Sequence, residues 1–179
     1  MPAQPRPFLD RALALCRVDL APAHRPPSAV RVAAATAVSI AGSLAADAAL
    51  VAIGTAIFPS TRGYVHFQFH DYARLTVIGV VIACLAWPVV TRISSQPRWL
   101  FFRLAILVTL ALWLPDLYIL ARGQPPEAVA VLMTMHLAIA LITYNCLVHL
   151  AKVGAARGPA PQTAPRQRAL PGAPRRPDR

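Results

Sequence analysis

Four long stretches of the chain are almost entirely apolar, and short polar segments separate them. The stretches cover about residues 32–58, 72–91, 99–121 and 128–151. Each holds about 20 residues or more, which is the length that an α-helix needs to cross a hydrocarbon layer about 30 Å thick. The pattern therefore predicts an all-α membrane protein, with a bundle of four transmembrane helices formed by residues 28–153.

Small residues recur along the first stretch at the spacing of one helix face, at every fourth position from Ala33 to Ala49. Such residues let the backbone of a neighbouring helix come close, which is one way that helices associate in lipid. We therefore expect the first span to be the hub of the bundle. The predicted helix-packing positions in the first two spans are Ala37, Ala41, Gly42, Ala45, Gly79 and Ala83.

Polar residues form a second stripe on the first span. Thr36, Ser39, Ser43 and Asp47 run down one side of it. A charged group at this depth costs at least about 2.5 kcal/mol, so it normally faces a protein interior or a water-filled cavity rather than lipid. We expect this stripe to turn inward.

Two further ionisable residues, Asp116 and His136, lie inside predicted spans, towards the same end of the bundle as Asp47. Asp47, Asp116 and His136 are therefore placed to share a cavity in the outer half of the bundle, the half away from the cytoplasm. The candidate ligand or proton site consists of Asp47, Asp116, His136, Ser43 and Thr143. Three interpretations stay open, namely a proton relay, a cation or ligand site, and a hydrogen-bonded clasp that only fixes helix packing.

The segments outside the bundle differ from it in composition. Within the N-terminal arm, residues 1–27, apolar residues recur at helical spacing over residues 8–20. This pattern predicts a short basic amphipathic helix, either at the membrane interface or against the cytoplasmic end of the bundle. Ser28 is placed to cap the first span. The basic tail, residues 154–179, is rich in Pro and Gly, which is typical of a disordered segment.

The overall composition supports the membrane class, because 56% of the residues are hydrophobic and 14% are charged. The formal net charge is +11, and the abundance of Ala, Arg and Pro favours a bacterial source. If both termini are cytoplasmic, fifteen of the 18 Lys and Arg residues lie on that side, which agrees with the positive-inside rule. We therefore predict a cell-membrane protein with both termini in the cytoplasm. The predicted contacts with anionic lipid headgroups come from Arg11, Arg17, Arg31, Arg92, Arg98 and Lys152.

The sequence holds no motif that indicates catalysis. Its three cysteines lack the spacing of a metal site or a disulfide framework. His66 and His70 are four residues apart and Asp71 follows, but the intervening Glu and the third ligand of a zincin are missing. We predict no metal, no cofactor and no catalytic residue. The basic residues lack interleaved aromatic residues, so nucleic acid is not a predicted partner.

Two short motifs stand near the outer ends of the last two spans, Leu114-Pro115 in the third and Met135-His136 in the fourth. Together with the small-residue first helix and the short basic turn after the second, they resemble a family of uncharacterised four-helix bacterial integral membrane proteins. The resemblance covers roughly residues 30–153. It implies the four-helix topology and no particular activity. Members of that family often carry Asn in place of Asp47, so a proton-handling role is not implied for it.

Two functions fit the sequence. The first is a non-enzymatic accessory or assembly subunit, which acts through its helix faces on other membrane proteins or on a second copy of itself. The alternative is a small transporter, or a ligand-binding or proton-binding membrane protein, in which Asp47, Asp116 and His136 line a polar cavity.

Overall fold

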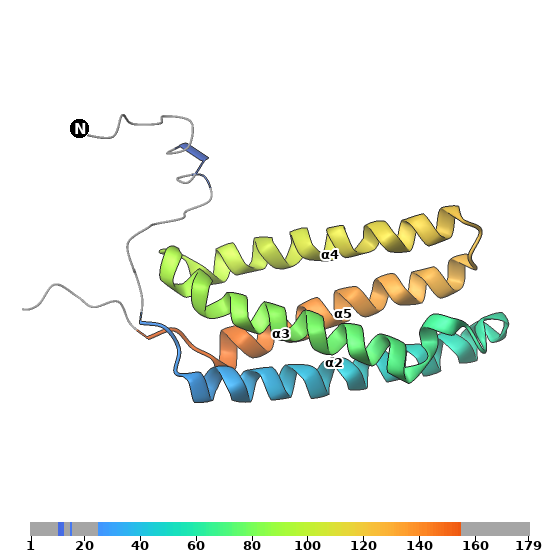
Figure 1. Cartoon of the computed structure of the whole chain (residues 1–179), viewed down its shortest axis with the longest axis horizontal. Coiled ribbons are helices and arrows are strands. Elements are labelled where there is room, and N and C mark those ends of the chain that lie inside the picture. Colours follow the sequence, from blue (N-terminus) through green and yellow to red (C-terminus); the bar gives the residue numbers. More distant parts are fainter. Residues whose placement is uncertain (1–10, 13–14, 16–24, 155–179) are drawn as a thin grey trace, which may run out of the picture.

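The computed structural model describes residues 11–12, 15 and 25–154, and four long helices dominate this part of the chain. They are α2 (Ala29–Ile57), α3 (Phe69–Ile93), α4 (Pro97–Ala121) and α5 (Pro126–Leu150). The helices lie side by side with alternating directions (Figure 1). Each is long and apolar enough to cross a membrane. The predicted all-α bundle of four apolar helices is therefore confirmed, and helices of this kind are those of a multi-pass membrane protein.

The helices begin two or three residues before the predicted spans. The Ser28 side chain accepts a hydrogen bond from the backbone N–H of Arg31, as predicted for a cap. Pro97 and Pro126 occupy the first turns of α4 and α5. Proline is tolerated there because the N–H groups of a first turn make no hydrogen bond within the helix. The polar link between α2 and α3 forms two short 3-10 turns, η1 (Pro59–Thr61) and η2 (Val65–Phe67).

The terminal segments lie mostly outside the described residues. The amphipathic helix predicted for residues 8–20 is described only at Arg11, Ala12 and Leu15, and of the tail predicted to be disordered only Gly154 is among the described residues. Arg25 and Gly154 bring the two ends of the bundle sequence together, because the N–H of Gly154 donates to the carbonyl of Arg25 at 3.3 Å. Both termini therefore leave from the same end of the bundle (Figure 1).

The hub of the bundle is α5 rather than the first span. Helix α5 contacts each of the other three helices, whereas α2 packs chiefly on α5 and α3. The expectation that the first span is the hub is therefore wrong. The close approach of α2 to α5 uses glycines instead of alanines, since Gly54 faces Val131 and Gly42 faces Ile142.

The predicted packing face of α2 points away from the bundle. Ala37, Ala41 and Ala45 are exposed, as is Gly79 on α3, while Gly42 and Ala83 are half-buried. The prediction that these three alanines and Gly79 pack inside the bundle is wrong. The reason is geometric, because the alanine stripe and the polar stripe are offset by two residues, or about 200° around a helix. Only one stripe can face inward, and leaving Asp47 in lipid would cost more than leaving alanines there.

The apolar core lies towards the end of the bundle that carries the termini. Trp87 and Leu147 are fully buried there, beside Val80 and Cys84. The Trp87 indole N–H donates to the carbonyl of Ala151 at 2.9 Å, so its polar atom is satisfied within the core. This cluster ties α3 to the end of α5.

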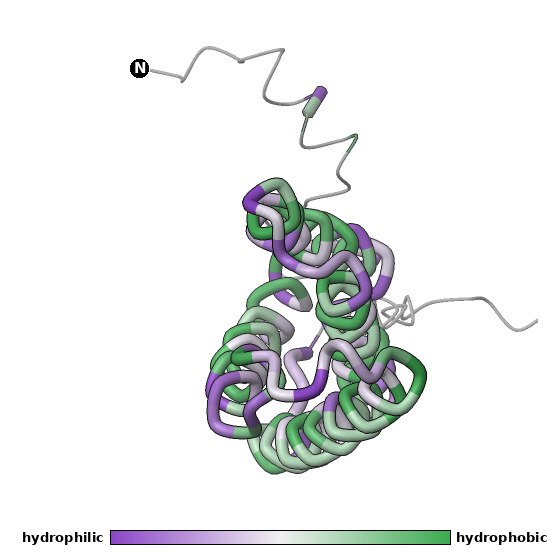
Figure 2. The backbone as a smooth tube through the Cα atoms, turned by 90° about the vertical axis from the view of Figure 1, so that its right-hand side faces the viewer, coloured by the Kyte–Doolittle hydropathy of each residue, from purple (hydrophilic) through white to green (hydrophobic). Residues whose placement is uncertain are grey.

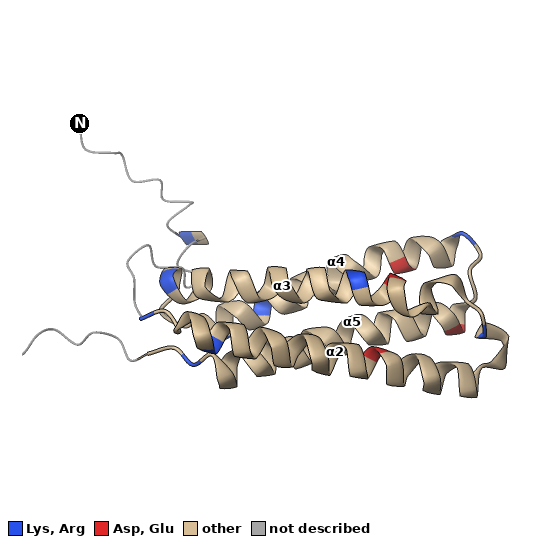
Figure 3. Cartoon of the chain, turned by 60° about the horizontal axis from the view of Figure 1, so that its bottom comes forward, with Lys and Arg blue, Asp and Glu red and all other residues tan. Residues whose placement is uncertain are grey.

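Charged residues are divided between the two ends of the bundle. Hydrophobic residues run along all four helices (Figure 2), and the acidic residues that the structure describes lie in the half away from the termini (Figure 3). Of the residues predicted to contact lipid headgroups, Arg31, Arg92, Arg98 and Lys152 are exposed at the end that carries the termini. Arg11 is exposed in the N-terminal arm, and Arg17 lies outside the described residues.

The contact at Gly54 provides a test of the α2–α5 packing. A Cβ atom at Gly54 would lie 2.7 Å from Cγ2 of Val131. We expect Gly54→Ala to lower the free energy of unfolding by about 1–3 kcal/mol, because an overpacked contact forces side chains and backbone to shift. The measurement is an unfolding titration of the purified protein in mild detergent, followed by circular dichroism.

Gly79→Ala is the matched control, since a Cβ atom there meets nothing within 4 Å. It should leave the stability unchanged or raise it slightly, because Ala favours a helix more than Gly does. An equal loss of stability in both variants would show that the α2–α5 contact is not the cause.

Candidate functional site

A line of polar side chains on α2 faces the interior of the bundle. Ser39, Ser43 and Asp47 are each 0% exposed. One carboxylate oxygen of Asp47, Oδ2, accepts a hydrogen bond from the hydroxyl of Thr76 on α3 at 2.7 Å. The other, Oδ1, is buried and has no hydrogen-bond partner among the described residues. The carboxylate is thus half satisfied by the protein.

Hydroxyl groups elsewhere in these helices bond to their own backbone. Four threonines donate to the carbonyl oxygen four residues earlier at 2.8 Å: Thr36, Thr55, Thr109 and Thr134. Three buried hydroxyls do not, and within the described part of the chain they have no partner: Ser39, Ser43 and Thr143. Because back-bonding is the common solution for a hydroxyl in an apolar helix, these three groups are available to another partner.

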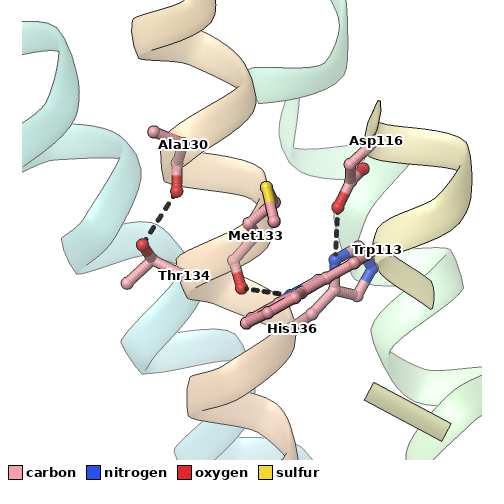
Figure 4. Close-up of polar contacts among 6 residues, drawn as sticks. All are labelled: Trp113, Asp116, Ala130, Met133, Thr134 and His136. Atoms are coloured by element: carbon pink, nitrogen blue, oxygen red, sulfur yellow. Dashed lines mark hydrogen bonds and ion pairs between the residues drawn. The ribbon is translucent and has the colours of Figure 1, made fainter. Parts of the chain in front are cut away.

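Asp116 and His136 form a second polar pair, between α4 and α5. Oδ2 of Asp116 lies 2.9 Å from Nδ1 of His136, within hydrogen-bond distance (Figure 4). The Asp116 side chain is 8% exposed and that of His136 is 27% exposed. Next to this pair, the indole N–H of Trp113 donates to the carbonyl of Met133 at 3.1 Å. These contacts hold α4 against α5 at one level.

The link between α2 and α3 reaches the Asp116–His136 pair from outside the helices. The ring of Tyr64 packs edge-on against His66 at 5.3 Å and Phe67 at 5.2 Å between centroids. Burial raises the pKa of the Tyr64 hydroxyl, and the nearby Asp116 carboxylate raises it further. Asp116 also interacts electrostatically with His66. The link therefore adds aromatic and ionisable groups to the outer end of the site.

Asp47 and the Asp116–His136 pair are neighbours without a shared hydrogen bond. The Asp47 carboxylate interacts electrostatically with His136, but among the described residues its hydrogen bond comes from Thr76. Each of the four side chains lies five to ten positions from the end of its helix opposite the termini: Asp47, Thr76, Asp116 and His136. At about 1.5 Å per residue they share one layer of the bundle. The structure thus brings Asp116 and His136 into contact at this end, while Asp47 bonds to Thr76.

The structure adds residues that sequence reasoning missed. Thr76 is the partner of Asp47, and Tyr72, one turn earlier on α3, is buried beside it. Thr76 stands four residues after Tyr72 and four before Val80, so it is a lone hydroxyl on a buried helix face. A lone hydroxyl on such a face indicates a polar partner on a neighbouring helix, so this role of Thr76 could have been predicted from the sequence.

The histidines considered for metal binding are not gathered into a metal site. His70 Nε2 lies 3.3 Å from Asp71 Oδ1 at the start of α3, while His66 belongs to η2. Among the described residues, no group of three or more His, Cys, Asp or Glu side chains is placed to hold a metal ion. The donors that the site offers are instead a carboxylate and hydroxyls.

The arrangement has the chemistry of a cation or proton site. It combines two carboxylates, one imidazole and the Thr76 hydroxyl in one layer, with the buried hydroxyls of Ser43 and Thr143 about one to two turns nearer the termini. Charges interact strongly in such surroundings, so a change in the protonation of one group alters the others. Comparisons of the chain with protein-family models, with curated proteins and with solved structures gave no match. The resemblance to the four-helix bacterial family therefore stays a prediction.

A double-mutant cycle tests the Asp116–His136 contact. We expect Asp116→Ala and His136→Ala each to lower the free energy of unfolding, and the two losses to be less than additive, with a coupling energy of about 0.5–3 kcal/mol. The reason is that the second substitution removes a group that has already lost its partner. The measurement is unfolding of all four proteins in the same detergent.

The same cycle with Thr134→Ala in place of Asp116→Ala is the control. The Thr134 hydroxyl bonds to its own helix and is exposed, so its loss should add to that of His136→Ala without coupling. Coupling of equal size in both cycles would count against a specific Asp116–His136 interaction.

Proposed function

We propose that this multi-pass protein of the cell membrane, with both termini in the cytoplasm, binds a small cation, another small polar ligand or a proton inside its helix bundle. The site is centred on Asp47, with the Asp116–His136 pair beside it. The observation that supports this most is the set of buried oxygen atoms that have no partner among the described residues, Asp47 Oδ1 and the hydroxyls of Ser43 and Thr143. Leaving such atoms unpaired costs about 1–3 kcal/mol each, which binding would recover.

The orientation is supported by the positions of the basic residues. The exposed arginines and the lysine at the end that carries the termini favour the anionic cytoplasmic leaflet. The Arg103 guanidinium lies 3.6 Å from the centre of the Trp99 ring, one turn nearer that end. This arrangement is typical of a basic side chain that reaches back towards headgroups. The candidate site then lies in the outer half of the membrane.

Asp47→Asn is the direct test of a binding function. Thermal unfolding of the purified protein in mild detergent is measured against a panel of salts, amines and small polar solutes, and over a range of pH. We expect at least one of these conditions to stabilise the wild-type protein, because a ligand that binds only the folded state raises its stability. The effect should be lost in Asp47→Asn, which keeps the shape of the side chain but not its charge.

Asp71→Asn is the matched control, because this carboxylate lies at the surface end of α3 and pairs with His70. It should respond to ligands as the wild-type protein does. If nothing in the panel stabilises the wild-type protein, or if Asp47→Asn responds like Asp71→Asn, Asp47 is a structural clasp and the proposal is wrong.

The accessory-subunit function is a second candidate, favoured by the exposed alanines of α2. The alanine ridge, which comprises Ala33, Ala37, Ala41, Ala45 and Ala49, is exposed along its whole length. A helix of another membrane protein could approach this ridge closely, because no large side chain stands in its way. This candidate and the binding site use opposite faces of α2, so they are independent.

We expect Ala41→Leu to abolish co-purification of a partner from native membranes in mild detergent, because a larger side chain separates the two backbones. Ala111→Leu on the exposed face of α4 is the control and should retain the partner. Purification of the wild-type protein as a monodisperse monomer without any co-purifying protein would contradict the accessory function.

A further inference from the structure

The burial of the Asp47 site limits the size of what it can hold. Asp47 and Ser43 are 0% exposed and Thr143 is 4% exposed. Side chains that are so completely enclosed leave no room for a solute of several non-hydrogen atoms unless helices separate. A single desolvated ion or a proton requires only small shifts of the surrounding side chains. Sugars, amino acids and larger amines would require the helices to separate.

The unpartnered atoms come from two helices, at positions within about 8 Å of one another along the bundle axis at about 1.5 Å per residue. Gly54 faces Val131 and Gly42 faces Ile142, which fixes the antiparallel register of α2 and α5. Ser43 and Thr143 each follow one member of the Gly42–Ile142 pair, so they stand at neighbouring heights on facing helices. Asp47 is one turn from Ser43 on the same buried face of α2. Together they offer one carboxylate oxygen and two hydroxyl oxygens.

These oxygen atoms favour hard cations over soft metals. Carboxylate and hydroxyl oxygens suit alkali and similar cations, whereas thiolate and imidazole donors favour transition metals. An ammonium ion is a second source of the same chemistry, since its N–H groups can donate to the same oxygens. The second oxygen of Asp47 is occupied by Thr76, which leaves Oδ1 as the charged ligand.

The charge of the surrounding groups favours a single positive charge. Asp47 faces His136 of α5, which pairs with Asp116 of α4, while α3 contributes Tyr72 and the link contributes Tyr64 and His66 near Asp116. The Asp116 carboxylate already has His136 as its partner, so Asp47 is the one carboxylate among these groups with an oxygen left for a ligand. A monovalent cation neutralises this carboxylate, whereas a divalent cation would leave an uncompensated positive charge away from water.

From this geometry we infer that the ligand is a small monovalent cation, held between Asp47 Oδ1 and the hydroxyls of Ser43 and Thr143. The inference rests on the proposed binding function and narrows it to one class of ligand. The cation enters from the outer end of the bundle, because the apolar cluster around Trp87 and Leu147 fills the other end.

The test uses the purified full chain in mild detergent, in a buffer whose only other cation is N-methylglucamine. Thermal unfolding is followed while LiCl, NaCl, KCl or NH4Cl is added, with N-methylglucamine chloride as the control for ionic strength. At least one of the four salts should raise the midpoint temperature saturably, whereas the control salt should not. Asp47→Asn should abolish this rise.

Thr143→Val and Thr91→Val form a matched pair that separates ligation from folding. Both threonines are buried, but the Thr91 hydroxyl donates to the carbonyl of Pro88 at 2.7 Å, far from the site in sequence and at the other end of α3. Thr143→Val should raise the half-maximal salt concentration roughly tenfold, through loss of one hydrogen-bonding ligand atom. Thr91→Val should leave that concentration unchanged. Valine has nearly the shape of threonine and leaves no buried polar atom, so Thr143→Val should fold even if Asp47→Asn does not.

Two results would overturn the cation inference. One is an equal response to the four salts and to N-methylglucamine chloride, and the other is an unchanged half-maximal concentration in Thr143→Val. If protonation stabilises the protein through Asp47 and none of the salts does, the cation inference is wrong and the proposed function stands with a proton as the ligand. If no salt, solute or change of pH alters the thermal stability in a way that depends on Asp47, both the cation inference and the proposed binding function are wrong.

Discussion

The placement of one carboxylate, that of Asp47, fixes the arrangement of the bundle. In lipid it would lose its hydration without a partner, so α2 must turn this side chain towards the other helices. That rotation carries Ser39 and Ser43 inward, because they lie on the same face. It also brings the Asp47 carboxylate against Thr76 of α3, at 2.7 Å. A single electrostatic requirement thus sets which face of α2 is buried and which helix hydroxyl must meet it.

The same constraint divides the bundle along its length. The half that holds the termini is closed by apolar and aromatic side chains, with the rings of Trp87 and Phe101 in edge contact at 5.1 Å between centroids. The other half holds the described acidic residues and His136, and lies under the aromatic link. A charged species in the polar half would have to leave its oxygen ligands to pass the apolar half, which is costly. The apolar cluster therefore closes the end of the described bundle that carries the termini to ions.

The sequence predicts the elements of this fold well and their rotation less well. Span lengths follow directly from apolar runs, and the Ser28 cap was readable because its side chain and the following apolar run stand together. The alanine stripe was assigned to the bundle interior because small residues favour close helix packing. That rule does not say which of two stripes on one helix faces inward. Comparing their angular offset and the cost of exposing each would have placed Asp47 inside and Ala41 outside.

Contacts between helices were harder to predict than positions along them. The sequence placed Asp47, Asp116 and His136 in one layer by counting residues from span ends, but pairing depends on rotation and on which helices are adjacent. Asp116 meets His136 because α4 packs on α5, and Asp47 meets Thr76 because α2 packs on α3. Each pair is consecutive in the chain, so these adjacencies follow from the order of the helices, but the rotation that brings the two side chains together does not. The two carboxylates consequently have different partners despite similar depths.

This difference between the two carboxylates favours a binding site over a clasp. Asp116 has a charged or polar partner in His136 at 2.9 Å, which is the arrangement expected of a residue that fixes two helices. Asp47 has one bond from Thr76, while its second oxygen and three other buried hydroxyls of α2 and α5 have no partner among the described residues. In a structure selected only for packing, serine hydroxyls would bond to their own helix, as four threonines here do. The unmet bonding capacity around Asp47 is therefore better explained by a ligand than by packing.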